Sequence, residues 1–358
     1  MGKRTYSAAL SLFMALMIVG CGNEKPSFSL LPDQDVFYQD LNSKTTASKI
    51  DILWVVDNSG SMETSQTNVA NNFQSFIENF QTKDMDFQIA VTTTEAYKSF
   101  YGHGSSWSRF RDGTDSTSHT GEFVLTPLTS MLTDTFMINI QQGINGNGNE
   151  RAFQSFREAL NNPNNSGFVR SDGFLSIVIV SDEDDFSRDS QAWSENYNVS
   201  DIHPVQDYVD YLDQLTNSTE DVKKYSVSAM AIFDEDCRDE LNLEWTGRKI
   251  GIRYGELVDA TGGVKGSLCG DFASELDVVS ENILSLATQF YLSRIPIVES
   301  IVVKLDGQII PNTATNPGPL TGGWEYVSET NSVVFKGDYI PQAGAQIQVD
   351  FDPVSYGG

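Results

Sequence analysis

Basic side chains are scarce in this chain of 358 residues. It has 23 Lys and Arg residues against 49 Asp and Glu, so its formal net charge is −26. A chain this acidic repels nucleic-acid phosphates and the negative surface of a lipid bilayer. The composition therefore argues against nucleic acid as a partner, and it leaves membrane attachment to some device other than surface charge.

Histidine is also scarce, and the usual catalytic motifs are missing. The three histidines, His103, His119 and His203, are scattered in polar segments and form no His-Glu-x-x-His pattern. None lies near a Gly-x-Ser-x-Gly elbow, and the stretch "GNGNE" lacks the third glycine of a dinucleotide fingerprint. The sequence therefore predicts a protein that is not an enzyme.

The apolar run near the N-terminus is too short to span a bilayer. It covers residues 8–19 and follows Lys3 and Arg4, which is the pattern of a signal peptide. We expect residues 1–20 to be this signal. Residues 21–45 are polar and aperiodic, which predicts a tether.

The signal ends in "IVGC", which resembles a bacterial lipobox. The resemblance implies that the chain is exported, is cut before Cys21 and carries a diacylglycerol on that thiol. Gly22 stands where lipoproteins of the inner membrane typically carry Asp, so the resemblance favours the outer membrane, on its periplasmic or cell-surface face. A plain secretory signal with a chance cysteine is the alternative.

Cysteine occurs only three times. Lipidation of Cys21 leaves Cys237 and Cys269, and export would place them in an oxidising compartment where they can pair. Such a disulfide closes a loop of about thirty residues and stabilises the fold by about 3 kcal/mol. Two buried free thiols are the alternative.

Residues 46–293 alternate between apolar strands and amphipathic helices. Strands are expected at 49–57, 86–94, 174–182 and 224–233, and helices at 63–80, 151–160, 205–215, 249–263 and 274–292. This alternation predicts an α/β fold with a doubly wound, mostly parallel sheet. Residues 294–358 contain only short strands, with a hairpin turn at Asp306-Gly307, and predict a small β domain.

A carboxylate and two hydroxyls follow the first buried strand in "DNSGS", residues 57–61. The alternation lets Asp57, Ser59 and Ser61 turn toward one point, and Asp182 ends another buried strand. Since the carboxyl ends of parallel strands gather ligand groups, we expect these four oxygen donors to meet. Such a set suits a hard divalent cation, Mg²⁺ above all, with Mn²⁺ or Ca²⁺ as alternatives.

The "DNSGS" stretch, in its order of strand, motif, helix and later strand ending in "VSDEDD", resembles the Asp-x-Ser-x-Ser motif of von Willebrand factor A domains. The resemblance covers roughly residues 48–293 and implies a metal-ion-dependent adhesion site. Its ligands would be Asp57, Ser59, Ser61 and Asp182. The ion would bind an Asp or Glu carboxylate of a protein partner.

One part of that pattern is missing. The family usually supplies a Thr from the loop before a central helix, and here the loop reads "GINGNGNERAF" without Thr. Asn149 is the nearest candidate for a neutral oxygen ligand. Glu150 beside it would add negative charge and weaken the pull of the ion on an outside carboxylate. Alternatively, Asn149 only caps the helix.

The sequence thus predicts a metal-dependent adhesion module of an envelope lipoprotein. The rivals are a structural envelope lipoprotein whose metal only stabilises the fold, and a metal-dependent hydrolase. The acids after Asp182 are expected to form a solvated rim. The aromatic, polar segment 96–122 is either a recognition loop or a surface insertion.

Overall fold

The computed structural model describes residues 33–38, 49–115, 118–219, 222–313, 322–342 and 345–354. The expected signal at 1–20, Cys21 and most of the expected tether lie outside these residues, so cleavage and lipidation stay predictions. Within the described ranges, no helix combines the length and the apolar character needed to cross a membrane.

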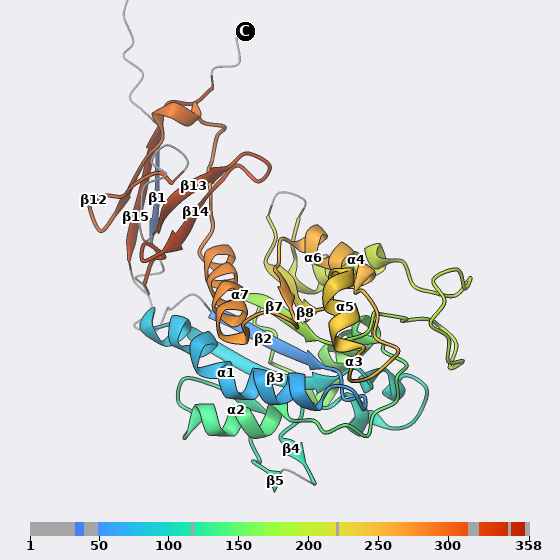
Figure 1. Cartoon of the computed structure of the whole chain (residues 1–358). Helices are drawn as coiled ribbons and strands as arrows, with labels where there is room; N and C mark the ends of the chain where they lie inside the picture. Colours follow the sequence, from blue (N-terminus) through green and yellow to red (C-terminus); the bar gives the residue numbers. More distant parts are fainter. Residues whose placement is uncertain are drawn as a thin grey trace, which may run out of the picture. The chain divides into compact units, whose positions relative to one another are not determined.

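A six-stranded sheet forms the centre of the α/β part, in the order β6-β3-β2-β7-β8-β9 (Figure 1). The strands are β2 (Lys49–Val56), β3 (Asp86–Thr93), β6 (Val124–Leu125), β7 (Gly173–Val180), β8 (Tyr225–Ala231) and β9 (Lys265–Ser267). Every neighbouring pair is parallel except β3 with β6. The predicted mostly parallel α/β sheet is confirmed.

Helices cover both faces of this sheet. They are α1 (Glu63–Thr82), α2 (Leu132–Ile140), α3 (Ala152–Asn161), α4 (Val205–Thr216), α5 (Glu235–Leu241), α6 (Ile252–Thr261) and α7 (Phe272–Ala287). Successive residues of β2 point to opposite faces, as strand geometry requires. Trp54 joins the core that includes α1, α2 and α7, whereas Leu53 and Val55 join the core that includes α3, α4 and α6.

The helix predictions hold with shifted ends, and two helices are additional. α6 starts later than expected, at Ile252, but ends before Gly262, which has the positive φ of a helix stop. α7 ends at Ala287 instead of continuing to residue 292, because β10 (Phe290–Tyr291) pairs with a later strand. The sequence analysis did not predict α2 and α5, which are both short.

Short elements fill the segment after β3. They are the 3-10 helices η1 (Ala96–Ser99) and η2 (Ser105–Ser108) and the strands β4 (Gly113–Thr114) and β5 (Ser118–His119), which pair with each other. A third 3-10 helix, η3 (Pro163–Asn165), follows α3. The predicted long loop is therefore folded back on itself.

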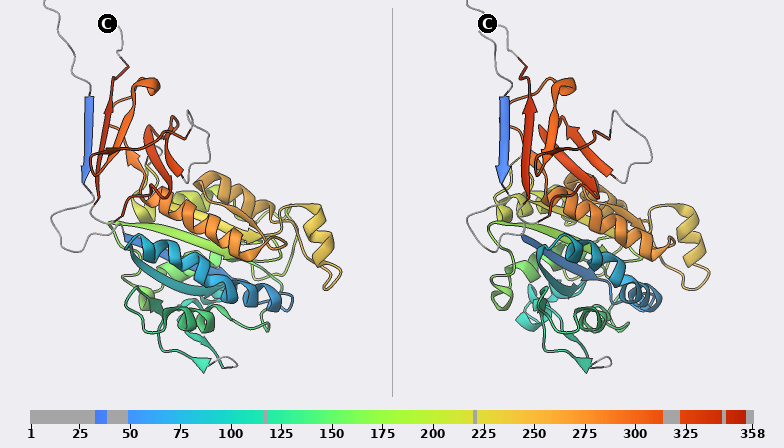
Figure 2. Two further views of the ribbon diagram at one scale, coloured as in Figure 1. Left: turned by 60° about the vertical axis from the view of Figure 1, so that its left-hand side comes forward. Right: turned by 90° about the vertical axis from the view of Figure 1, so that its left-hand side faces the viewer.

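Two antiparallel sheets make the β part, which Figure 2 shows beside the α/β part. One contains β1 (Asp33–Tyr38), β11 (Val302–Leu305), β12 (Gln308–Ile309) and β15 (Gln346–Phe351), and the other contains β10, β13 (Gly322–Val327) and β14 (Ser332–Gly337). η4 (Val298–Ser300) precedes β11. The hairpin at Asp306-Gly307 is confirmed, and both residues have positive φ.

The N-terminal strand β1 corrects the predicted domain limits. Its six residues pair antiparallel with β15, from Asp33 opposite Phe351 to Tyr38 opposite Gln346. Part of the expected tether is therefore a strand of the β part, and β10 likewise extends that part before residue 294. Pairing uses main-chain groups, so a short segment such as DQDVFY can join a sheet without an apolar alternation.

Candidate functional site

The "DNSGS" motif lies where β2 and β7 end side by side. The backbone N–H of Asp57 donates to the carbonyl of Val180 at 2.9 Å, which continues the pairing by one residue. Asp182 follows two residues later on the neighbouring strand. On β2, the fully buried ring of Trp54 packs edge-on against Phe76 and Phe136 and holds the strand in the core. The expected meeting of the two strand ends is present.

The carboxylate of Asp57 is completely buried and held by two donors. The Ser59 N–H donates to Oδ1 and the Ser181 hydroxyl donates to Oδ2, each at 2.8 Å. Burial, and then the negative charge of Asp182, raise the pKa of Asp57 to about 7, although both donors oppose this. The group is therefore rigid, and a nearby cation would stabilise its charged form.

The hydroxyls of Ser59 and Ser61 form a short hydrogen-bonded row that ends at Asp182. Ser59 Oγ lies 3.4 Å from Ser61 Oγ, and Ser61 Oγ donates to Asp182 Oδ1 at 3.0 Å. Asp182 is buried, and Ser59 is nearly so. The structure thus brings together the four residues that the sequence predicted: Asp57, Ser59, Ser61 and Asp182.

Arg248 is a site residue that the sequence analysis missed. Its Nε donates to Asp182 Oδ2 at 2.6 Å, and its Nη2 donates to the Ser61 carbonyl at 3.3 Å. The residue lies between α5 and α6, and carbonyls of Leu241 and Trp245 accept from its Nη1. No local motif marks it, because only the fold brings that connection to the end of β7.

The loop before α3 carries Asn149 and Glu150, the two candidates for the position of the missing Thr. With its amide oxygen toward Arg151, Asn149 accepts from Nη2 at 2.9 Å and from Nε at 3.2 Å. In this orientation the Asn149 amide oxygen is shared with Arg151, and its role as a metal ligand stays a prediction. Glu150 is the residue of the pair that interacts electrostatically with Asp57.

Glu150 is an unusual buried carboxyl group. It is 1% exposed, and neither side-chain oxygen has a hydrogen-bond partner among the described residues. Burial, followed by the charge of Asp57, raises its pKa well above the ordinary value. Glu183 nearby behaves similarly: burial, then the charge of Asp57, raise its pKa to about 9. Glu150 and Glu183 therefore add two carboxyl groups to those of Asp57 and Asp182 at the site.

Two close contacts hold this loop on the motif. The Gly146 N–H donates to the Asn58 carbonyl at 2.7 Å, and a Cβ on Gly146 would lie 2.6 Å from Asn58 Oδ1. The Gln66 amide, on α1, donates to the carbonyls of Asp57 and Gly143 at 2.8 and 2.9 Å. Glycine at position 146 therefore allows the acidic loop to approach the motif.

The expectation of a solvated acidic rim after Asp182 is wrong for two residues. Asp184 and Asp185 are fully buried. Asp185 Oδ1 accepts from the Phe153 N–H at 3.0 Å in the first turn of α3, and Asp184 accepts from the Arg253 N–H in the first turn of α6. Both carboxylates therefore cap helix N-termini, and this role depends on where two distant helices begin.

The donor set fits a small hard cation through its oxygens. Among the described residues, no three His, Cys, Asp or Glu side chains form a group that could hold a metal ion. A site here would instead combine the carboxylates of Asp57 and Asp182 with the hydroxyls of Ser59 and Ser61, which is chemistry suited to Mg²⁺. The unpartnered buried carboxyl of Glu150 also favours a positive charge nearby.

The predicted disulfide is confirmed. Cys237 and Cys269 are bonded, with their Cα atoms 5.7 Å apart and a sequence separation of 32. Cys237 lies in α5, and Cys269 lies between β9 and α7. The bond therefore ties the segment that precedes Arg248 to the edge of the sheet.

Comparison with known proteins finds no matching family model and no matching curated protein. Similar solved structures include the pilus adhesin SpaC from Lactobacillus rhamnosus GG in its open conformation, with 10% identity and a TM-score of 0.39 over 89% of this chain and 42% of SpaC. Proximal thread matrix protein 1 from the mussel byssus has 13% identity and a TM-score of 0.36, over 70% and 51%.

The pilus adhesin RrgA from Streptococcus pneumoniae is a third similar structure, with 9% identity and a TM-score of 0.30 over 90% of this chain and 57% of RrgA. The chain thus spans roughly half the length of each of these proteins. Similarity at this level assigns neither a family nor a function.

Proposed function

We propose that this chain is a von Willebrand factor A-type binding module that holds one divalent cation at Asp57, Ser59, Ser61 and Asp182. The observation that carries the proposal is the convergence of these four residues where β2 and β7 end. β3 and β7 flank β2 on opposite sides, so the chain changes direction across the sheet there. Ligands of open α/β sheets bind at such a point.

The cation would supply an open coordination position for a carboxylate of a protein partner. Ser59 and Ser61 are neutral, so they leave much of the charge of the ion uncompensated. Arg248 also leaves more of the charge of the ion uncompensated, because it already neutralises part of the charge of Asp182. An ionised Glu150 would compensate part of the charge of the ion. The balance of these two side chains sets how strongly the ion attracts an outside carboxylate.

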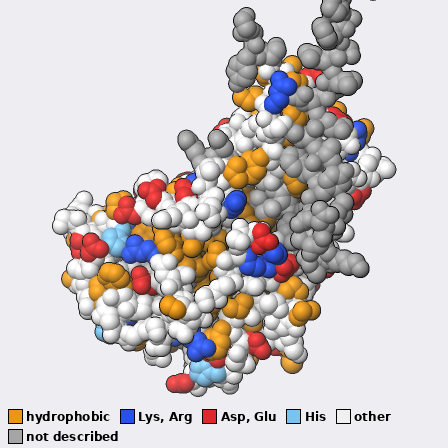
Figure 3. All heavy atoms as spheres, turned by 180° about the vertical axis from the view of Figure 1, so that it is seen from behind, with side chains coloured by type: hydrophobic (Ala, Val, Ile, Leu, Met, Phe, Trp, Pro, Cys, Tyr) orange, Lys and Arg blue, Asp and Glu red, His pale blue; other side chains and the backbone are white. Residues whose placement is uncertain are grey.

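The proposal includes a protein partner, attachment through a lipid on Cys21 and the outer membrane as location. It includes no nucleic acid, because of the formal charge of −26. On the face shown in Figure 3, Lys and Arg side chains are scattered among Asp and Glu side chains. We propose binding and not hydrolysis, because the sequence carries none of the usual catalytic motifs.

Calorimetry with Mg²⁺ tests the metal site. Wild type should bind one ion, Mn²⁺ should replace Mg²⁺, and Ca²⁺ should bind less well. Asp57→Ala should bind none and keep its fold by circular dichroism. Asp236→Ala is the matched control, because Asp236 is exposed in the first turn of α5 and has no role at the motif. Equal binding by wild type and Asp57→Ala would refute the site.

A second experiment separates adhesion from a structural role. Proteins retained from an envelope extract by wild type in Mg²⁺ are compared with those retained in EDTA and by Asp57→Ala. Thermal unfolding is measured under the same conditions. Retention that disappears while the protein stays folded supports adhesion. Retention that persists in EDTA, with a lower unfolding temperature, supports the structural rival.

A further inference from the structure

A pocket of about 320 Å³ opens beside the motif, and none of its lining residues belongs to the proposed metal ligands. Its walls come from three segments: η1 and the residues after it, the loop before α3, and the chain beyond β7. Tyr97, Tyr101 and Trp193 supply aromatic surface, and Asn147, Asn149 and Gln191 supply amides. Part of the predicted recognition segment 96–122 therefore borders a cavity.

The floor of this pocket is preorganised by Arg151. This guanidinium is fully buried and stands over the ring of Tyr97, 4.7 Å from its centroid. Its Nη1 donates to Tyr101 Oη at 3.1 Å and to the Ser190 carbonyl at 2.8 Å, and it also binds the amide oxygen of Asn149. A ligand would therefore meet side chains whose positions are already set, which lowers the entropic cost of binding.

The rim of the pocket is available for contact. Trp193 is 66% exposed, and Asn147 and Gln191 are also exposed. A large exposed indole is costly to leave in water, and Trp is enriched among residues that dominate binding energy. The aromatic rim above a fixed polar floor is the form expected of a binding site.

Charge at the pocket favours a neutral ligand. Lys98 is the one Lys or Arg among the lining residues, and its amine pairs with Glu95 and stands over the ring of Trp107. The chain as a whole carries a formal charge of −26. His103 is the other basic lining residue, and it is exposed. The net charge of the chain repels an anionic ligand at longer range.

We propose that this pocket binds a neutral saccharide. A sugar ring presents C–H groups on its faces, which lie favourably on the negative face of an aromatic ring. Its hydroxyls both donate and accept hydrogen bonds, and the exposed amide of Gln191 can do the same. The volume is near the lower end of the roughly 300–1,000 Å³ found for small-molecule sites, so the pocket takes the end of a glycan chain.

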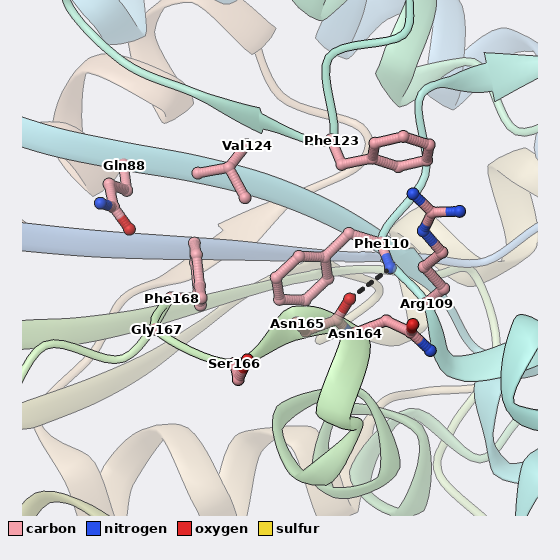
Figure 4. Close-up of a pocket in the computed structure, with 10 residues that line it drawn as sticks. All are labelled: Gln88, Arg109, Phe110, Phe123, Val124, Asn164, Asn165, Ser166, Gly167 and Phe168. Atoms are coloured by element: carbon pink, nitrogen blue, oxygen red, sulfur yellow. Dashed lines mark hydrogen bonds between the residues drawn. The ribbon is translucent and has the colours of Figure 1, made fainter.

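A second aromatic pocket, drawn in Figure 4, is a poorer candidate. It also combines aromatic rings with amides, and Phe110 and Phe168 pack there with ring centroids 4.8 Å apart. However, Asn165 accepts from the Phe110 N–H and donates to the carbonyls of Ser108 and Ala159. No Trp lines this second pocket, whereas Trp193 is 66% exposed at the rim of the pocket bordered by η1.

A glycan array of neutral, sialylated and sulfated oligosaccharides, probed with the full chain, tests the proposal. At least one neutral oligosaccharide should bind, and titration with the free sugar should show a loss of at least tenfold in affinity for Trp193→Ala. Trp245→Ala is the matched control, because Trp245 is also exposed but lies outside the pocket. Its affinity should equal that of wild type.

The proposal goes beyond the proposed metal function and does not depend on it, so binding is measured in Mg²⁺ and in EDTA. Equal binding in both is expected. Absence of any neutral ligand, binding confined to acidic glycans, or unchanged affinity in Trp193→Ala would each overturn it. Binding that is lost in EDTA would also overturn it, since the sugar would then be bound by the ion.

Discussion

Arg248 and Asp182 form a buried ion pair, with 2.6 Å between Nε and Oδ2. The pair spans 66 positions of sequence and joins the connection between α5 and α6 to the end of β7. The other carboxylate oxygen of Asp182 accepts from Ser61, so the arginine reduces the charge of Asp182 without covering its motif side. Arg248 therefore acts on both the fold and the proposed cation.

Replacing Arg248 by Met should lower stability and raise metal affinity. Loss of one partner leaves a buried carboxylate uncompensated, which costs about 3–5 kcal/mol of unfolding free energy. The same uncompensated charge should attract Mg²⁺ more strongly. Urea unfolding in EDTA measures the first effect, and calorimetry with Mg²⁺ measures the second.

The control for that variant is Arg238→Met. Arg238 pairs with Asp239 at 2.8 Å, in a partly exposed position on α5. Its loss should change neither stability nor metal affinity appreciably, because exposed ion pairs contribute little. Similar results for the two variants would mean that the contact with Asp182 has no special role.

Stability of the metal-free protein should fall as the pH rises from about 4 to about 9. Burial raises the pKa of Asp51 and Asp184 to about 6, of Asp57 to about 7 and of Glu183 to about 9. A carboxyl group with a raised folded pKa binds its proton more tightly when folded. Its stabilising effect is complete below the unfolded pKa of roughly 4, and is lost as the pH passes the folded pKa.

Urea unfolding in EDTA at several pH values measures this dependence. Glu183→Gln should flatten the decline between pH 7 and pH 9, since Glu183 is the group that titrates last of these four. The interpretation fails if the metal-free protein becomes more stable across that range, or if the variant keeps the full decline.

Removing the disulfide should destabilise the protein by about 3 kcal/mol. The bond between Cys237 and Cys269 restricts the unfolded chain over 32 positions. The Cys237→Ser, Cys269→Ser double variant is compared with wild type by urea unfolding. A reductant should lower the stability of wild type to that of the variant and leave the variant unchanged. A wild type insensitive to reductant in unfolding would contradict a stabilising bond.

Gly146→Ala should weaken metal binding while the sheet stays folded. The new Cβ would lie 2.6 Å from Asn58 Oδ1 and 2.7 Å from the Asn58 carbonyl, so the loop or the motif must shift. Such overpacking is expected to lower the free energy of unfolding by about 1–3 kcal/mol. Calorimetry with Mg²⁺ and circular dichroism are the measurements.

Gly148→Ala is the matched control on the same loop. Its Cβ would meet Glu183 Oε1 at 3.6 Å, an ordinary contact, and φ is not positive there. Metal affinity should be retained. If both alanine variants bind Mg²⁺ like wild type, the approach of the loop to Asn58 does not control the site.

Prediction from sequence succeeded where a short segment carries its own signal. In α1, Val69, Phe73, Phe76, Ile77 and Phe80 recur at helical spacing, and all five are buried. In β15, Ile347, Val349 and Phe351 alternate with polar residues, and all three are buried. Prediction failed for β1, since an added edge strand is selected by its partner β15 and not by its own pattern.

Sequence patterns identified the long strands β2, β3, β7 and β8, the helices α1, α3, α4, α6 and α7, and the placing of Asp57 and Asp182 after buried strands. They also identified Cys237 and Cys269 as the cysteines available for pairing. These follow from apolar periodicity and residue type, which act over a few positions. Three features arise only in the folded chain: Arg248 neutralises part of the charge of Asp182, Glu150 interacts with the charge of Asp57, and Asp184 and Asp185 cap helices. Each depends on packing between segments tens of residues apart, and local sequence patterns do not encode such contacts.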